Sequence, residues 1–195
     1  TRDLGGRVTR AIHDCRKPVL AAINGPAVGI GATMTLAMDR RIASTSARVG
    51  LVFGRLGVVP EAASTWFLPR LVGMSTALDV AYRADIYDAE TACSLGLVDE
   101  VHEADALLPR AKEIVDAWTR GRSAVAIALT RQMMRRNAAQ PHPVEAHRID
   151  SLGMFYTSLG DGKEGVQAFL EKRKPNFTSR ASQMPPFYDD WVGGE

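Results

Sequence analysis

The stretch KPVLAAINGPAVGIGATMTLAMDRRIASTSARVGL, residues 17–51, decides the fold. Its first nine residues form an apolar run that ends in Asn-Gly, a pattern typical of a strand buried on both faces. Spaced glycines follow, and after them come Ala, Met and Leu, which favour helices. Two short strand-like pieces then flank residues 44–47. The stretch therefore predicts strands that alternate with helices.

Helical patterns continue beyond this stretch and dominate the second half of the chain. Asp88 is a candidate N-cap and Gly96 a candidate C-terminal stop, while Asp161 with Glu164 resembles a capping box. The tail after Phe177 is expected to be loop or an extended arm. The whole predicts an α/β class with a helical C-terminal portion. We expect a short strand over 97–103 and helices over 7–15, 74–84, 88–96, 105–120, 123–137, 143–159 and 161–175.

Composition restricts the kind of protein. The chain has 195 residues, 46% of them hydrophobic, with a formal net charge of +2. This mild charge argues against nucleic acid as the main partner, and no apolar stretch reaches the roughly 18 residues of a membrane span. Cys15 and Cys93 lie far apart in the sequence. Two isolated cysteines are typical of reduced thiols in a cytoplasmic protein. The four histidines show no metal-ligand spacing, so we expect neither a metal nor a bound cofactor.

A glycine cluster separates the predicted strand from the predicted helix. Gly25, Gly29 and Gly31 match neither a dinucleotide fingerprint nor a P-loop. One interpretation is tight packing of strand against helix. The other is a set of backbone N–H groups at a helix N-terminus that stabilises an anion, such as the oxygen of a thioester enolate.

Glu61 stands alone among apolar residues, between Pro60 and Ala62. A carboxylate in such a setting is expensive to bury without a partner. One interpretation is a surface carboxylate that caps a helix beginning near Ala62. The other is a proton-transfer base, since apolar surroundings favour proton uptake by a carboxylate. Local sequence leaves both open.

Several blocks in order resemble the enoyl-CoA hydratase/isomerase, or crotonase, superfamily. They are residues 17–51, LGVVPEAASTWFLPRLVG (56–73), DAETACSLGLVDEV (88–101) and EGVQAFLEKRKPNF (164–177), so that the resemblance covers about 7–177. It implies a crotonase-like spiral of ββα repeats and a helical C-terminal trimerisation region. We expect a core over 1–120, the helical region over 121–177 and a tail over 178–195. It further implies an acyl-CoA thioester substrate and a homotrimer or hexamer.

The resemblance also assigns roles to single residues. Two backbone N–H groups hold the enolate oxygen in this family, and one of them falls on Ile30, between Gly29 and Gly31. The other comes from a segment with no counterpart before Lys17, so we expect the chain to be N-terminally incomplete.

Phe169 and Lys172 match family positions that reach the coenzyme A of a neighbouring subunit. Phe169 would pack near the adenine and Lys172 would face a phosphate. A plain amphipathic helix end with solvated cations is the alternative. Coenzyme A is here part of the substrate, not a cofactor.

The choice of reaction depends on three positions. Family hydratases use two glutamates to activate water, at the positions held here by Thr33 and Phe53. Glu61 instead matches the single catalytic glutamate of Δ3,Δ2-enoyl-CoA isomerases. We therefore predict an isomerase that carries a proton from C2 to C4. The expected substrate-binding residues are Gly29, Gly31, Thr33, Phe53, Pro60, Phe169 and Lys172.

Three alternatives remain at this point. The first is an enoyl-CoA hydratase (lyase) that uses Glu61 alone, and the second is another enolate reaction of the superfamily. The third is a non-catalytic homologue that binds RNA or serves as a scaffold. The acyl chain, the pathway and the choice between trimer and hexamer are also open.

Overall fold

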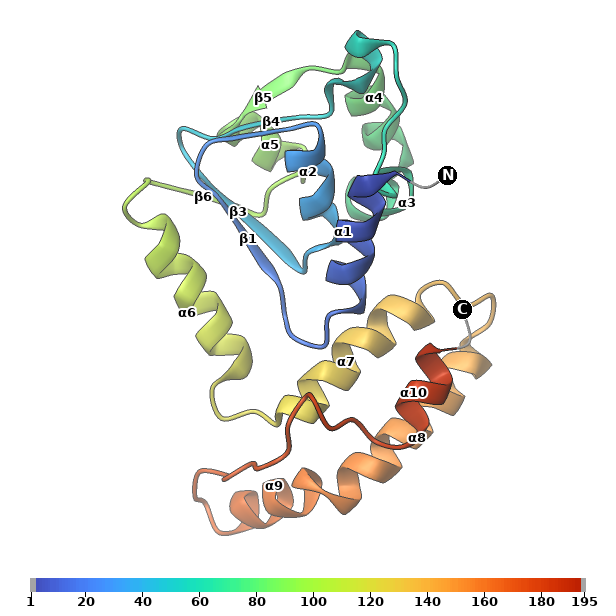
Figure 1. Ribbon diagram of the computed structural model, residues 1–195. Helices are drawn as coiled ribbons and strands as arrows, with labels where there is room; N and C mark the ends of the chain where they lie inside the picture. Colours follow the sequence, from blue (N-terminus) through green and yellow to red (C-terminus); the bar gives the residue numbers. More distant parts are fainter. Residues whose placement is uncertain (1–2, 194–195) are drawn as a thin grey trace. The chain divides into compact units, whose positions relative to one another are not determined.

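A computed structural model describes residues 3–193, which divide into two units (Figure 1). The first unit holds residues 3–15 and 19–115, and the second holds residues 16–18 and 116–193. The division expected at residues 120 and 177 stays a prediction. No helix within 3–193 is long and apolar enough to cross a membrane.

Two three-stranded sheets form the frame of the first unit. Strands β1 (Leu20–Ile23), β3 (Arg40–Ser44) and β6 (Glu100–His102) are all parallel, in the order β1-β3-β6. In the second sheet β2 (Pro26–Val28) runs parallel to β4 (Arg48–Gly50), and β4 runs antiparallel to β5 (Ile86–Asp88). The pairs β1–β2 and β3–β4 thus each contribute one strand to each sheet before the chain turns into a helix, whereas α5 (Ala89–Ser94) separates β5 from β6.

In the first unit α1 precedes the strands, and the other helices follow strands (Figure 1). Alanines with almost no exposed surface, among them Ala37, Ala43 and Ala47, let strands and helices approach closely. The helices are α1 (Leu4–Asp14), α2 (Ile30–Thr33), the 3-10 turns η1 (Met34–Ala37) and η2 (Val52–Leu56), α3 (Ser64–Val72), α4 (Met74–Arg83) and α5 (Ala89–Ser94). Helix α6 (Leu107–Thr119) contains the boundary between the units.

The second unit is helical throughout its regular structure. Helix α7 begins after Ser123, whose hydroxyl accepts a hydrogen bond from the Ala126 N–H at 3.2 Å. The elements are α7 (Ala124–Asn137), α8 (Pro143–Leu159), α9 (Asp161–Leu170) and α10 (Phe187–Val192). The predicted α/β class with a helical C-terminal portion is confirmed.

The sequence signals for helix ends are confirmed at α5 and wrong at the start of α9. Asp88 caps α5 by accepting from the Thr91 N–H at 2.8 Å, and Gly96 has a φ of +76°. The capping box expected at Asp161 is wrong, because Gly160 is the N-cap of α9. Asp161 accepts instead from the N–H of Thr178, 17 residues further on.

The predicted loop after Phe177 is also wrong in part, because residues 187–192 form α10. Tyr188 on this helix is 2% exposed and belongs to a cluster with Val125 and Leu129 of α7. The Arg16 guanidinium lies 4.8 Å from the centre of the Tyr188 ring. Aromatic burial thus orders a segment whose prolines and glycines suggest a loop.

Candidate functional site

The glycine-rich turn carries β2 into α2. Gly29 has a φ of +59°, which favours glycine, and its N–H donates to the Gly50 carbonyl of β4 at 3.0 Å. The Gly29 carbonyl accepts from the N–H groups of Ala32 and Thr33, at 3.0 and 2.9 Å. Ile30 is the first residue of α2, and an N–H at that position has no acceptor within its own helix. The turn therefore leaves the Ile30 N–H without an acceptor in its helix, at the position where the family resemblance predicts a backbone donor.

Glu61 lies beside this turn. The Thr33 hydroxyl donates to Glu61 Oε1 over 2.5 Å, and Thr33 itself is fully buried. Ala62 and Ala63 have φ values of 58° and 54°, so that α3 begins only at Ser64. The interpretation of Glu61 as a cap on a helix starting near Ala62 is wrong, since Glu61 precedes a left-handed turn and bonds to α2.

The N-terminal end of α1 closes the other side of the Glu61 carboxylate. A methyl group added at Gly5 would lie 1.8 Å from Glu61 Oε2 and 2.6 Å from Ile30 Cδ1. Only a residue without a side chain fits between them in this conformation. Segments around residues 5, 30 and 61 therefore meet at one point.

Asp3, which the sequence does not single out, lies against the segment that carries Glu61. Its Oδ1 accepts from the N–H groups of Gly6, at 2.6 Å, and of Ala62, at 3.2 Å. The Gly6 hydrogen bond is the main cause that lowers the pKa of Asp3, and desolvation opposes it. Hydrogen bonds from Ala62 and from the Glu61 side chain lower this pKa further. The sequence is compatible with an N-cap at Asp3, but it does not reveal the contact of Asp3 with Ala62, 59 positions away.

The electrostatic setting of Glu61 is unusual for a partly buried carboxylate. Within residues 3–193 its recorded hydrogen-bond partner is the Thr33 hydroxyl, and no ion pair to a cation is recorded for it. The Thr33 hydroxyl thus holds the Glu61 carboxylate beside the glycine-rich turn that begins α2.

Phe53 and Pro60, two other residues of the first unit that are predicted to bind substrate, differ in their exposure to solvent. Phe53, on η2, is 8% exposed and belongs to the hydrophobic core. Pro60 is half-buried and follows Val58 and Val59, which are 56% and 80% exposed. An apolar, accessible segment thus leads to Glu61.

Phe169 and Lys172 belong to the second unit and are described within it. Phe169 is 82% exposed near the end of α9, and Lys172 follows with a φ of +54°. The Lys172 N–H donates to the Phe169 carbonyl at 3.2 Å. Across residues 3–193, no group of three or more metal-ligating side chains is found.

Comparisons with known proteins agree on one family. The family model for enoyl-CoA hydratase/isomerase matches residues 5–180. The enoyl-CoA hydratase AFT3-1 of Alternaria alternata is 45% identical over 90% of this chain and 60% of its own length. A crotonyl-CoA hydratase of Syntrophomonas wolfei is 38% identical over 91% of this chain and 68% of its own length.

Solved structures share the fold. An enoyl-CoA hydratase from Bacillus anthracis superposes with a TM-score of 0.82 at 32% identity, over 89% of this chain and 67% of that one. The predicted crotonase-like fold is confirmed. The chain spans 60% of the length of the Alternaria relative.

Proposed function

Because the chain belongs to the enoyl-CoA hydratase/isomerase, or crotonase, family, we propose that the protein moves the double bond of an acyl-CoA thioester from position 3 to position 2. The observation that carries the proposal is the hydrogen bond from Thr33 to Glu61. It places one carboxylate against the turn whose backbone would hold the thioester oxygen.

Glu61 is the proton carrier in this reaction. Its carboxylate removes a proton from C2 of the 3-enoyl thioester, and the electron pair delocalises onto the thioester oxygen. The Ile30 N–H stabilises that oxygen, and one such donor is worth about 3 kcal/mol. The Glu61 carboxyl group then returns the proton at C4, while the double bond settles between C2 and C3.

Two residues support isomerisation over water addition. Thr33 stands where a family hydratase has its first glutamate, and here its hydroxyl holds Glu61. Phe53 stands where the second would be, and it is buried in the core. Neither can deprotonate water, whereas one carboxylate suffices for a proton transfer from C2 to C4.

The test compares the wild type with Glu61→Gln in purified full-length protein on a 3-enoyl-CoA. Formation of the conjugated 2-enoyl thioester is followed by its absorbance. Loss of a positioned base should lower the rate by roughly 10²–10⁴-fold. Undiminished isomerisation by Glu61→Gln would show that Glu61 is not the proton carrier.

Hydration of a 2-enoyl-CoA is the second candidate. It is favoured by the similar proteins from Alternaria and Syntrophomonas, which are named as hydratases. Incorporation of ¹⁸O from labelled water into a 3-hydroxyacyl-CoA measures this reaction directly.

Binding of the coenzyme A portion is proposed for Phe169 and Lys172. The exposure of Phe169 leaves its ring available to an adenine, and the Lys172 ammonium would meet a phosphate. The proposal includes an assembly of three or six copies in the cytoplasm and no separate cofactor. Size-exclusion chromatography with light scattering would measure the number of copies.

A further inference from the structure

We propose that Glu164 and Arg173 are positioning residues, whose ion pair holds the Lys172 ammonium in place for a phosphate of the coenzyme A portion of the substrate. The inference deepens the proposed function and rests on it, because it concerns the binding segment at the end of α9. What is new is the pair of residues that fixes this segment, and the reason why a lysine stands in it.

The end of α9 has the hydrogen bonds of a Schellman motif. The Lys172 N–H donates to the Phe169 carbonyl at 3.2 Å, and the Arg173 N–H donates to the Ala168 carbonyl at 3.0 Å. The motif gives Lys172 a φ of +54°. Glycine is the usual residue at this position, because a side chain costs free energy in the left-handed conformation. A lysine kept at such a cost indicates that its side chain has a use.

The residue after the lysine is fastened to α9 by an ion pair. Arg173 Nη1 and Nη2 donate to the two carboxylate oxygens of Glu164, at 2.6 and 2.9 Å. Such a two-point contact fixes the orientation of a guanidinium group as well as its distance. Arg173 Nε donates to Glu171 Oε2 at 2.6 Å, and Glu164 Oε1 also accepts from the Asn176 N–H at 2.7 Å. One carboxylate therefore holds both sides of the segment that follows Lys172.

Further contacts continue this attachment along the helix. The Thr178 and Ser179 N–H groups donate to Asp161 Oδ1, at 3.3 and 3.4 Å. The Phe177 ring lies over Gly165, where an added methyl group would meet it at an ordinary 3.5 Å. The chain after the turn thus follows α9 back towards its first residue. A single exposed ion pair contributes little, whereas this one belongs to a continuous set of contacts.

The ion pair also determines which cation remains available to a ligand. The Arg173 guanidinium is paired with the carboxylates of Glu164 and Glu171. Lys172 is exposed, and no carboxylate within residues 3–193 is recorded as a partner of its ammonium group. A phosphate that approaches this turn therefore meets Lys172, while Arg173 serves to hold the backbone beside it.

The experiment measures the Kd of coenzyme A by titration calorimetry on the purified full-length protein, so that no turnover is needed. Lys172→Gly removes the ammonium and supplies the residue that the φ of +54° favours. Its thermal midpoint should equal or exceed that of the wild type. Its affinity should fall by about 10-fold, as expected for loss of one hydrogen bond to a charged group. Lys172→Arg keeps a cation and should recover most of the affinity.

A double-mutant cycle tests the positioning role. Glu164→Gln alone should weaken binding by about 5-fold, and in the Lys172→Gly protein it should have no further effect, because no ammonium is left to hold. Arg173→Gln removes the same ion pair from its other side and should give the same pattern, also if Glu164→Gln fails to fold. Lys174→Ala is the matched control, since it removes a neighbouring ammonium outside the Schellman motif, and it should leave the Kd unchanged.

Each outcome decides the proposal. A loss of affinity in Glu164→Gln that depends on Lys172 supports it, even where the wild type does not isomerise and the proposed function fails. It is overturned if the wild type does not bind coenzyme A, or if Glu164→Gln weakens binding equally with and without Lys172. Tighter binding by Glu164→Gln would mean that Arg173 itself meets the phosphate, and an equal loss in Lys174→Ala would mean that charge alone accounts for binding; both results contradict the proposal. Normal binding by the Glu164 and Arg173 variants of a protein that isomerises overturns it and leaves the proposed function in place.

Discussion

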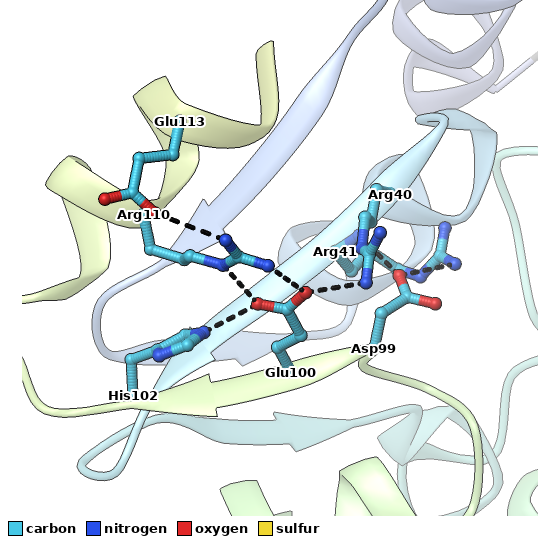
Figure 2. A network of polar contacts seen from close by, with 7 residues as sticks. All are labelled: Arg40, Arg41, Asp99, Glu100, His102, Arg110 and Glu113. Carbon is cyan, nitrogen blue, oxygen red and sulfur yellow. Dashed lines mark hydrogen bonds and ion pairs between the residues drawn. The ribbon is translucent and has the colours of Figure 1, made fainter. Parts of the chain in front are cut away.

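Two partly buried glutamates of the first unit, Glu61 and Glu100, have opposite surroundings. Glu100 on β6 accepts from Arg40 Nη2 at 2.6 Å and from Arg110 Nε at 2.8 Å, and it contacts His102 Nε2 at 2.8 Å (Figure 2). The recorded hydrogen-bond partner of Glu61 within residues 3–193 is a hydroxyl, that of Thr33. A carboxylate surrounded by cations is held as an anion, and Glu61 has no such cations around it among the described residues.

The Glu100 cluster is structural. Bonds from Arg110 are the main cause that lowers the pKa of Glu100 from 4.5 to about 2; His102 and Arg40 add to the effect, while desolvation opposes it. Figure 2 shows how these side chains join β3, β6 and α6. A group this firmly ionised is a poor proton carrier near neutral pH, so we assign it to stability.

After the loss expected for Glu61→Gln, the largest predicted effect concerns the space around Glu61. In Gly5→Ala the new methyl group would displace Oε2, the flexible end of the Glu61 side chain. Stability should change little, while isomerisation falls by about 100-fold, since a misplacement of about 1 Å costs that much. Steady-state kinetics and thermal unfolding measure the two effects.

Gly54→Ala is the matched control for this variant. A methyl group there meets Ala81 O and Ala84 Cβ at an ordinary 3.7 Å. It should leave the isomerisation rate unchanged. If Gly5→Ala also isomerises at the wild-type rate, the placement of Glu61 against α1 has no part in catalysis.

The next effect concerns Glu100. Glu100→Gln leaves Arg40 and Arg110 without their carboxylate. These arginine side chains are 35% and 39% exposed, and water therefore screens part of the loss. We expect the free energy of unfolding to fall by about 2 kcal/mol, with isomerisation unchanged at a temperature where the variant stays folded. Urea denaturation tests this.

The loss of unfolding free energy in Glu100→Gln should depend on pH in one direction. Since folding lowers the pKa of Glu100 from 4.5 to about 2, its contribution is complete above about pH 5 and is lost as the pH falls towards 2. The difference in unfolding free energy between wild type and Glu100→Gln should shrink over that range. A difference that grows on acidification contradicts the assignment.

The smallest predicted effect concerns Thr33. Thr33→Val keeps the side-chain shape but removes the hydroxyl that donates to Glu61. Isomerisation should fall by about 10-fold, which corresponds to about 1.4 kcal/mol for one hydrogen bond to a charged group. Thr33→Ser restores the hydroxyl and should recover most of the rate. Equal rates for Val and Ser would show that the hydroxyl does not position Glu61.

Local sequence predicted the parts of the fold that local physics determines. The strand before Asn24, which is buried at only every second residue and not on both faces as predicted, the cap at Asp88 and the stop at Gly96 depend on residues within one turn of each other. The end of the chain was misread because α10 depends on burying Tyr188 against α7, a contact more than 50 residues away. Tertiary burial here overrides the loop signals of nearby prolines and glycines.

Contacts between distant segments also limited what the sequence could predict about the candidate site. The blocks around the glycine-rich turn pointed to Thr33, Ile30 and Glu61, which the structure brings together. Asp3 was missed because its bond to the Ala62 N–H joins segments 59 residues apart. The left-handed turn at Ala62 was equally hidden, since alanine carries no signal for a positive φ.

The most direct test of the account measures activity and stability together for Glu61→Gln and Glu100→Gln. The account predicts a crossed result: Glu61→Gln loses isomerisation by roughly 10²–10⁴-fold and keeps its unfolding free energy, whereas Glu100→Gln keeps its activity and loses stability. If Glu61→Gln instead isomerises normally but unfolds more easily, Glu61 is a structural carboxylate like Glu100 and the central claim is wrong.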